Sequence, residues 1–301
     1  MKHLLSLESL GRGEIKDVID LAVKLKAERS DYSYRPLENQ VWAMIFSKSS
    51  TRTRVSFEVG IRELGGAVMN LSPRDMQLGR GEPIKDTARV IGRMVSGCVI
   101  RTYDQQDVVD FANFAEVPTI NALTDEEHPC QVLADLLTMR ELCGGWDGKK
   151  VVFLGDGDNN MARSWMWASE RLGFELVIAA PEKYQPPGDY MARFDGGSIR
   201  CEADIEAAVD GADVLYTDVW ASMGQEEESA ERCEDLKGTQ INARLTARAK
   251  PGALVMHCLP AYRGKEISEE SLEANAATIF QEAENRLHAQ KAVLAILTDQ
   301  R

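Results

Sequence analysis

The sequence predicts an α/β protein built from parallel sheets in two domains, and three observations support this prediction. Short apolar runs rich in β-branched residues alternate with amphipathic segments, a pattern typical of parallel α/β units. The runs fall into two groups, separated by the glycine-rich stretch 143–150. A length of 301 residues suits two domains of ordinary size. The expected strands are 41–46, 97–101, 117–121, 150–156, 174–180, 213–218 and 253–258.

The last element is expected to be a helix over 282–297. Leu287, Val293, Leu294 and Leu297 form an apolar stripe along this segment. The sequence alone leaves open which of the two domains this helix packs on.

Composition argues against several classes of partner. The chain contains 44% hydrophobic and 28% charged residues, and its net charge is −13. Nucleic acids and anionic membranes would be repelled, so neither is expected as a partner. The six cysteines include no CxxC pair and indicate neither a disulfide framework nor a zinc site, which fits a reducing cytoplasm. The N-terminal stretch is too short and too polar to be a signal peptide, and no apolar run is long enough to span a membrane.

The segment "SSTRTR" (49–54) follows the first expected strand and begins a helix. Ser50 or Thr51 is placed to cap that helix, which should run to about Leu64 before Gly65 and Gly66 end it. Free backbone N–H groups, hydroxyls and the guanidinium of Arg52 then form a cradle for a phosphate. The alternative is an ordinary capped helix with solvated arginines.

Arg54 is assigned less directly than Arg52. Two positions further along the helix, its side chain points elsewhere, so it either serves the site from the far side or pairs with Glu58 one turn on.

Two further polar positions follow strands of the first group. In "HPCQ", Pro129 suits a first helical turn, and His128 and Gln131 lie three residues apart, close enough to address one ligand. Cys130 is interpreted as a small buried residue whose side chain points away from that ligand. Arg101 ends the strand 97–101, where it can face an anion or simply be a solvated arginine.

The second group opens with a strand followed by Gly155-Asp156-Gly157. The third glycine of a dinucleotide-binding GxGxxG motif is absent, because Asn160 stands there. The carboxamides of Asn159 and Asn160 suit the carboxylate and ammonium of an amino acid better than a pyrophosphate. A dinucleotide-dependent oxidoreductase is therefore disfavoured.

Two more residues follow expected strands in this group. Asp218 can pair with an ammonium group, and Cys258 ends the strand 253–257, where Leu259 and Pro260 define a turn. Cys258 is not interpreted as a covalent nucleophile, since no general base completes a recognisable triad; a buried inert thiol is the alternative. The acidic run 226–228 and the acidic residues after it are interpreted as a solvated face.

Five stretches, in order, resemble the transcarbamylase family of aspartate- and ornithine-specific enzymes. They are "SSTRTR" (49–54), "QLGRGEPIKDTARVIGR" (77–93), "HPCQVLADLLT" (128–138), "HCLP" (257–260) and "ENRLHAQKA" (284–292). The resemblance implies two Rossmann-like domains. Residues 1–142 with the returning C-terminal helix 284–301 would bind carbamoyl phosphate, and 143–283 would bind the amine acceptor. It also implies a homotrimer or an assembly of trimers, with active sites at subunit interfaces.

The resemblance also implies roles for individual residues. Arg101 contacts both the phosphate and the carbonyl oxygen, His128 polarises that oxygen, and Gln131 holds the carbamoyl amide. The residues implied to bind carbamoyl phosphate are Ser50, Thr51, Arg52, Thr53, Gln77, Arg101, His128, Gln131, Cys258, Leu259 and Arg286. Gln77 would reach into a neighbouring subunit's site, and for Arg286 a helix-surface ion pair with Glu282 is the alternative.

The acceptor implied by the resemblance is L-ornithine. The residues implied to bind it are Asn160, Asp218, Ser222 and Met223, the last two in an "SMG" loop typical of ornithine-specific members. The catalytic residues would be Arg101, His128, Asp218 and Cys258. The implied reaction is carbamoyl transfer to the δ-amine of ornithine without a cofactor or metal, and the sequence shows no metal-ligand cluster. Transfer to another amine, such as putrescine or an N-acylated ornithine, remains the alternative, and a non-catalytic homologue is disfavoured because each motif carries a competent residue.

Overall fold

The computed structural model describes residues 1–299 except 32, 73–75, 77–80, 195 and 222–228. The chain divides into two compact units. Unit 1 comprises Met1–Leu137 and Glu284–Arg301, and unit 2 comprises Thr138–Ala283. Helices α5 (Pro129–Leu142) and α12 (Ala276–Thr298) carry the chain from one unit to the other.

Unit 1 contains a parallel sheet with the strand order β2-β1-β3-β4. Its strands are β1 (Val41–Phe46), β2 (Ala67–Leu71), β3 (Gly97–Arg101) and β4 (Thr119–Leu123). The two central strands, β1 and β3, have the predicted bounds. Strand β2 was not predicted; it lies at an edge of the sheet, and most of its side chains are exposed or half-buried, so it lacks a continuous apolar run.

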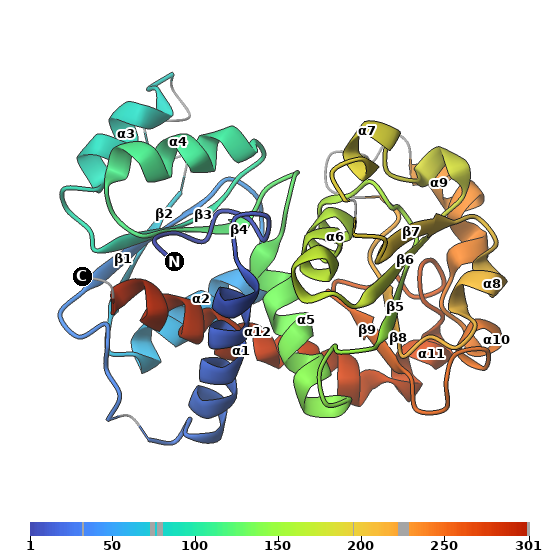
Figure 1. Ribbon diagram of the computed structural model, residues 1–301. Coiled ribbons are helices and arrows are strands. Elements are labelled where there is room, and N and C mark those ends of the chain that lie inside the picture. Colours follow the sequence, from blue (N-terminus) through green and yellow to red (C-terminus); the bar gives the residue numbers. More distant parts are fainter. Residues whose placement is uncertain (32, 73–75, 77–80, 195, 222–228, 300–301) are drawn as a thin grey trace. The chain divides into compact units, whose positions relative to one another are not determined.

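Helices cover both faces of this sheet (Figure 1). Helices α3 (Ile84–Ile91) and α4 (Gln105–Ala115) pack on one face, where Ala43, Ile45, Cys98 and Ile100 form an apolar cluster with them. Helices α1 (Arg12–Ala27), α2 (Thr51–Glu63) and the C-terminal part of α12 lie on the opposite side. The C-terminal helix therefore packs back on the N-terminal unit, as the resemblance implied. It begins at Ala276, six residues before the predicted start.

Unit 2 contains a five-stranded parallel sheet with the order β7-β6-β5-β8-β9. Its strands are β5 (Lys150–Leu154), β6 (Glu175–Ala179), β7 (Ile199–Glu202), β8 (Val214–Thr217) and β9 (Leu254–His257). Strand β7 was not predicted and, like β2, is a partly exposed edge strand. The other four lie within the predicted runs, and the α/β class with two parallel sheets is confirmed.

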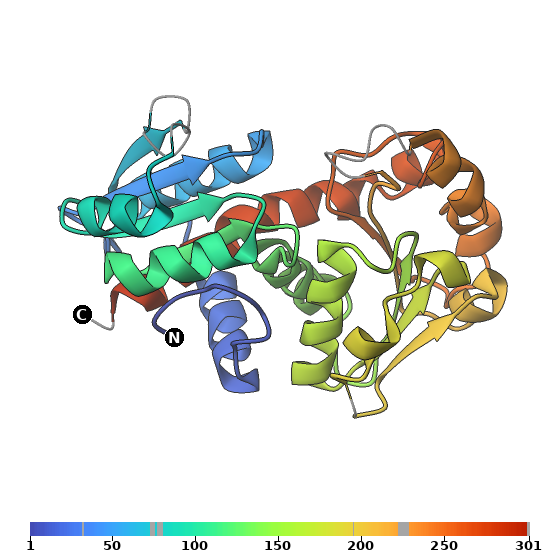
Figure 2. The same cartoon turned by 90° about the horizontal axis from the view of Figure 1, so that it is seen from above.

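Helices also flank the sheet of unit 2 on both faces (Figures 1 and 2). On one face, helix α6 (Asn160–Leu172) buries Trp165 against Tyr216 of β8 and Phe174, with ring centroids 5.1 and 5.9 Å apart. On the other face, helices α8 (Ile205–Val209), α10 (Ala243–Thr246) and α11 (Glu269–Ala274) contribute to a second apolar cluster. The described residues also form α7 (Gly188–Met191), α9 (Ser229–Leu236) and the short 3-10 helices Glu182–Tyr184 and Lys237–Thr239.

Within the described residues, no helix is long and apolar enough to cross a membrane.

Candidate active-site residues in two units

The helix that follows β1 begins as predicted. Ser50 is its N-cap, and the Ser50 hydroxyl accepts a hydrogen bond from the backbone N–H of Thr53 at 3.3 Å. The helix ends at Glu63, and Gly65 adopts a positive φ of 91° directly after the C-cap residue Leu64. The N-terminus of α2 thus stands beyond the carboxyl end of β1, where ligands bind in open parallel sheets.

Arg54 does not form the ion pair with Glu58 that was one of its two predicted roles. Its Nη1 donates to Oδ1 of Asn70 at 3.3 Å, and its guanidinium lies over the ring of Phe46. Glu58 instead pairs with Arg62, one turn further along α2. Arg54 therefore connects α2 to strands β1 and β2.

A buried hydrogen-bond network connects three of the candidate residues of unit 1. Nη1 of Arg286 donates to Oε1 of Gln131 at 2.5 Å, and Nη2 donates to the Thr53 hydroxyl at 2.9 Å. Nε2 of Gln131 donates to Oδ1 of Asp135 at 2.8 Å. The orientation of the Gln131 amide is thereby determined, because arginine can only donate and an ionised carboxylate can only accept.

This network favours the interpretation of Arg286 as a candidate site residue, because its guanidinium bonds two other candidate residues. Glu282, its predicted alternative partner, accepts a hydrogen bond from the backbone N–H of His257. Asp135 was not among the predicted residues, although its position four residues after Gln131 on α5 signals a shared helix face.

His128 lies among positive charges. Its imidazole is buried, and its pKa is held well below the usual value, first by loss of hydration and then by the charges of Arg286, Arg101 and Arg52. A neutral imidazole can donate one hydrogen bond to a carbonyl oxygen without bringing a further charge. Three guanidiniums near one buried ring also create a local positive potential in a chain whose net charge is −13.

Cys130 is buried, and its Sγ donates to the backbone oxygen of Asn121 at 3.3 Å. Burial raises the pKa of this thiol to about 12. The predicted inert, buried role of Cys130 therefore agrees with its surroundings.

In unit 2, Asp218 and Cys258 meet beyond the ends of β8 and β9. The Cys258 thiol donates to Oδ1 of Asp218 at 2.9 Å, and the backbone N–H of Val219 donates to the same oxygen at 2.7 Å. Burial raises the pKa of Asp218, an effect that these hydrogen bonds partly oppose. Among the residues that the structure describes, no lysine or arginine bonds this carboxylate, so a ligand carrying an ammonium group would supply the missing positive charge.

His257 orients the turn that contains Cys258, a role that the sequence did not reveal. Its Nδ1 accepts from the backbone N–H of Leu259 at 2.9 Å, and its Nε2 lies 3.1 Å from Oε1 of the buried Glu266. Nε2 must therefore carry the hydrogen and donate it to Glu266. Leu259 has a φ of 54°, a conformation that costs a leucine about 1–2 kcal/mol, and the bond to His257 helps to hold it.

The ligand atoms of Asp218, His257 and Cys258 lie within 4.8 Å of one another, a spacing that a metal ion could use. This cluster was not predicted, because Asp218 is distant from the other two residues along the chain. Both ring nitrogens of His257 and the thiol of Cys258 already take part in the hydrogen bonds described above. These hydrogen bonds orient Cys258 and Asp218.

The two carboxamides predicted after β5 differ in their roles. Asn159 is the N-cap of α6, and its side chain accepts from the backbone N–H of Ala162 at 2.8 Å. Asn160 occupies the first turn of that helix and remains the candidate ligand. Nearby, the buried Arg232 binds the carboxylate of Asp156 and donates to the backbone oxygen of Trp220 at 2.7 Å; neither Arg232 nor Asp156 was predicted.

Three predicted residues, Gln77, Ser222 and Met223, lie outside the described residues. Thr51 and Arg52 are on the first turn of α2, Thr51 exposed and Arg52 half-buried, and Arg101 is a buried residue at the end of β3. The structure thus brings Arg52, Arg101 and Arg286 near His128, and it brings Cys258 into contact with Asp218.

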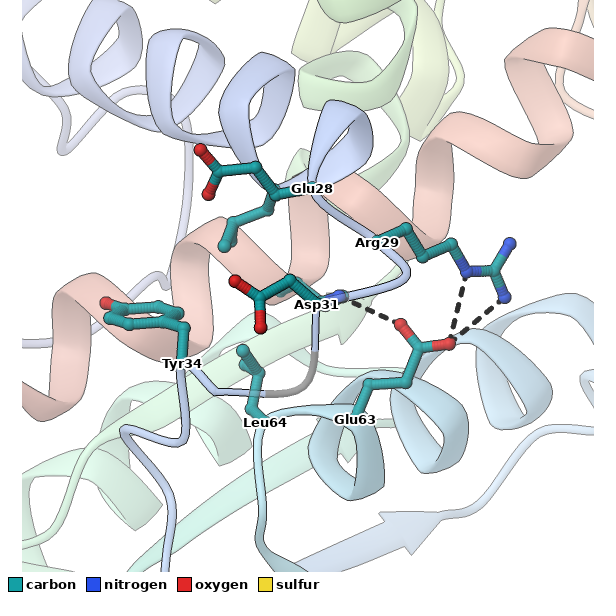
Figure 3. A pocket seen from close by; sticks show the side chains of 8 residues that line it. Glu28, Arg29, Asp31, Tyr34, Glu63 and Leu64 are labelled. Carbon is teal, nitrogen blue, oxygen red and sulfur yellow. Dashed lines mark hydrogen bonds and ion pairs between the residues drawn. The ribbon is translucent and has the colours of Figure 1, made fainter.

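A small pocket in unit 1 lies elsewhere (Figure 3). It is lined by Leu25, Glu28, Arg29, Asp31, Tyr34, Glu63, Leu64 and Lys291. Glu63 accepts hydrogen bonds there from Arg29 and, at 2.8 Å, from Lys291. Because Glu63 is the last residue of α2 and Ser50 caps its first turn, the pocket is about 20 Å from the candidate phosphate cradle.

Comparison with known proteins identifies the family. Residues 2–141 match the model of the aspartate/ornithine carbamoyltransferase carbamoyl-P binding domain, and residues 147–297 match that of the Asp/Orn binding domain. The chain is 59% identical to ornithine carbamoyltransferase of Akkermansia muciniphila, covering 100% of this chain and 99% of that protein. Identity to the enzyme of that name from Nitratiruptor sp. is 50%, with 100% and 99% covered.

Solved structures agree with this assignment. The anabolic ornithine carbamoyltransferase of Campylobacter jejuni superimposes with a TM-score of 0.93 at 42% identity, covering 100% of both chains. The ornithine carbamoyltransferase of Pyrococcus furiosus gives 0.93 at 45% identity, with 100% and 98% covered. The sequence motifs, the two parallel sheets and these matches along the whole chain have one explanation: the chain belongs to the aspartate/ornithine carbamoyltransferase family.

Proposed function

We propose that the chain transfers the carbamoyl group of carbamoyl phosphate to the δ-amine of L-ornithine, forming L-citrulline and phosphate. The observation that carries this proposal is the pair of Asp218 and Cys258 in the unit that matches the Asp/Orn binding domain. A half-buried carboxylate that no described cation bonds suits a cationic acceptor such as ornithine and would repel aspartate. Relatives at up to 59% identity are named for the same activity.

The donor is proposed to bind in unit 1. Ser50, Thr51, Arg52, Thr53 and Arg101 would hold the phosphate at the N-terminus of α2, where unpaired backbone N–H groups favour an anion. Gln77 is included by resemblance alone.

The carbamoyl group is proposed to be held by His128, Gln131 and Arg286. The Gln131–Arg286–Thr53 network supports this assignment, because it orients the polar groups before any ligand arrives. Arg101, His128 and Thr53 would stabilise the charge that develops on the carbonyl oxygen. One well-placed donor to such an oxygen contributes about 3–4 kcal/mol to catalysis.

The acceptor is proposed to bind in unit 2 through Asn160, Asp218, Ser222 and Met223. An alkyl amine is neutral only about one part in a thousand near neutral pH, which costs about 4 kcal/mol. Asp218 and Cys258 would orient the amine, and removal of water would lower the pKa of that amine. The amine nitrogen then attacks the carbamoyl carbon, the bond from that carbon to the phosphate oxygen breaks, and the departing phosphate takes up the proton that the amine loses. Cys258 and Leu259 are also proposed to contact carbamoyl phosphate, so Cys258 would contact both substrates.

These assignments give each domain one substrate. Residues 1–142 with 284–301 are proposed as the donor domain and 143–283 as the acceptor domain. The family models, which are described as carbamoyl-P binding and Asp/Orn binding, support this division.

The test is a citrulline-forming assay on the purified protein and on Arg52→Ala, with Arg62→Ala as the matched control. Arg62 is on the same helix but is exposed and paired with Glu58. Arg52→Ala should raise the KM for carbamoyl phosphate about a hundredfold, because a charge-assisted contact contributes about 1.5–3 kcal/mol, whereas Arg62→Ala should not. Equal activity with putrescine or an N-acylated ornithine would contradict the proposed acceptor.

A homotrimer or an assembly of trimers is the proposed oligomeric form. Val55 on α2 and Met69 on the edge strand β2 support association, since these apolar side chains are 56% and 46% exposed. Sedimentation equilibrium should give a mass of three chains or a multiple of three, and a monomer at micromolar concentration would contradict this proposal.

A cytoplasmic role in arginine biosynthesis is also proposed. Support comes from six free cysteines, which suit a reducing compartment, and from the Campylobacter jejuni enzyme, which is described as anabolic. Expression should restore growth without arginine to a strain that lacks this activity, and failure of an actively expressed protein to do so would contradict the role.

A further inference from the structure

Lys48 is a buried lysine in the turn between β1 and α2, two residues before the N-cap Ser50. Its side chain is only 5% exposed. Burying an ammonium group costs several kcal/mol unless charged or polar partners compensate. None of the substrate-binding roles described above includes this residue, so the reason for its burial has to lie in its contacts.

Two side chains compensate the buried charge. The Lys48 ammonium bonds the carboxylate of Asp125 and lies over the ring of Tyr103, 4.2 Å from the ring centroid. A cation over an aromatic face is attracted by the negative centre of the ring, most strongly when water is excluded. The side chain of Asp125 is 65% exposed, so the carboxylate reaches the ammonium from the solvent side.

The partners of Lys48 lie close in the chain to candidate residues of the donor site. Tyr103 lies two residues after Arg101, in the loop between β3 and α4, and Asp125 lies three residues before His128, between β4 and α5. Lys48 itself stands four residues before Arg52. One ammonium group therefore joins the three loops that adjoin Arg52, Arg101 and His128 in the chain.

Backbone hydrogen bonds also connect the same three loops to one another. The N–H of Ser47 donates to the oxygen of Arg101 at 2.8 Å, and the N–H of Asp125 donates to the oxygen of Tyr103 at 2.8 Å. The backbone groups of these loops are therefore already paired with one another, and Lys48 adds a side chain that contacts all three segments.

We propose that Lys48 is a positioning residue for carbamoyl phosphate, which ties the three strand-end loops of unit 1 together through Asp125 and Tyr103. The inference rests on the proposed donor-binding function of these loops. Direct binding of phosphate by Lys48 is the competing explanation. The geometry disfavours it, because the carboxylate and the ring already occupy the surroundings of the ammonium.

The experiment is a double-mutant cycle with Lys48→Met, Asp125→Asn and the double variant, each assayed for the KM of both substrates. Lys48→Met should raise the KM for carbamoyl phosphate at least about tenfold, the scale of coupling for a contacting charged pair. The KM for ornithine should change less than about twofold. The KM of the double variant for carbamoyl phosphate should be no higher than that of Lys48→Met, because both changes remove the same Lys48–Asp125 contact. Lys16→Met, an exposed lysine of α1, is the matched control and should leave both values unchanged.

Variants at the partners of Lys48 keep the test decisive if Lys48→Met does not fold. Tyr103→Leu and Asp125→Asn change exposed residues and should each raise the KM for carbamoyl phosphate while the melting temperature stays near that of the wild type. Lys48→Arg should recover most of the affinity, since it keeps the charge and the contact with the ring.

Other results would overturn the inference. Effects of Lys48→Met and Asp125→Asn that multiply in the double variant would show that Lys48 acts on the phosphate directly. An unchanged KM in all three single variants would show that the tie has no influence on the donor. If the wild type itself forms no citrulline from the two substrates, the proposed function fails instead, independently of Lys48.

Discussion

Replacing Glu127 by glutamine should change how stability depends on pH, because Glu127 is a buried carboxyl group beside His128. Burial raises its pKa from 4.5 to about 8, although Oε2 accepts the backbone N–H of Leu7 at 2.7 Å. Between these two pKa values, the folded protein holds a proton that the unfolded chain has released. Stability from this group is therefore fully present below the unfolded pKa and is lost as the pH rises towards 8.

The magnitude follows from the two pKa values. For a single group with pKa values of 4.5 and about 8, the free energy of unfolding falls by about 2.5 kcal/mol from about pH 5 to about pH 7. Glutamine has nearly the same shape and cannot titrate, so Glu127→Gln should lack this fall. The difference between the two proteins is the informative quantity, since all other groups contribute equally to both.

The assay is urea unfolding of both proteins at fixed protein concentration across this pH range. Glu127→Gln should gain stability relative to the wild type as the pH rises. Asp17→Asn, which removes an exposed carboxylate on α1, should follow the wild type throughout. Parallel curves for Glu127→Gln and the wild type would refute the reasoning, because they would show that the Leu7 N–H and neighbouring groups keep the carboxylate ionised in the folded state.

Three further predictions concern single positions. Asp218→Asn should lower kcat/KM for ornithine about a hundredfold, the scale of a lost charge-assisted contact, while calorimetric titration should show unchanged binding of carbamoyl phosphate; loss of donor binding would contradict the assignment. The depressed pKa of His128 predicts a neutral ring around pH 6.5, which a nitrogen-15 NMR titration can check; protonation in that range would contradict the argument from burial and nearby charges. Gly97→Ala should lower the free energy of unfolding by about 1–3 kcal/mol, because the added methyl would lie 2.6 Å from the ring of Trp42; an unchanged urea midpoint would show that the ring can move.

The sequence alone predicted the class of fold and the central strands of both sheets. Strands β1 and β3 are buried on both faces and therefore appear as uninterrupted apolar runs, with the predicted bounds. Strands β2 and β7 were missed because their side chains are exposed or half-buried, and such positions do not require apolar residues; the other two edge strands, β4 and β9, are largely buried and were predicted. Local chemistry also identified the capped start of α2, since a hydroxyl N-cap acts within three residues of itself.

Tertiary structure decided which side chains meet. Arg286 bonds Gln131 and Thr53 across 155 and 233 residues of chain, a pairing that no local spacing encodes. The same holds for Lys48 with Asp125 and for Cys258 with Asp218. The physical reason is that parallel strands bring their carboxyl ends to one edge of a sheet, however far apart they lie in the chain. Capping motifs and candidate residue types can thus be predicted from the sequence. The orientation, burial and partners of the polar groups depend on how the chain folds.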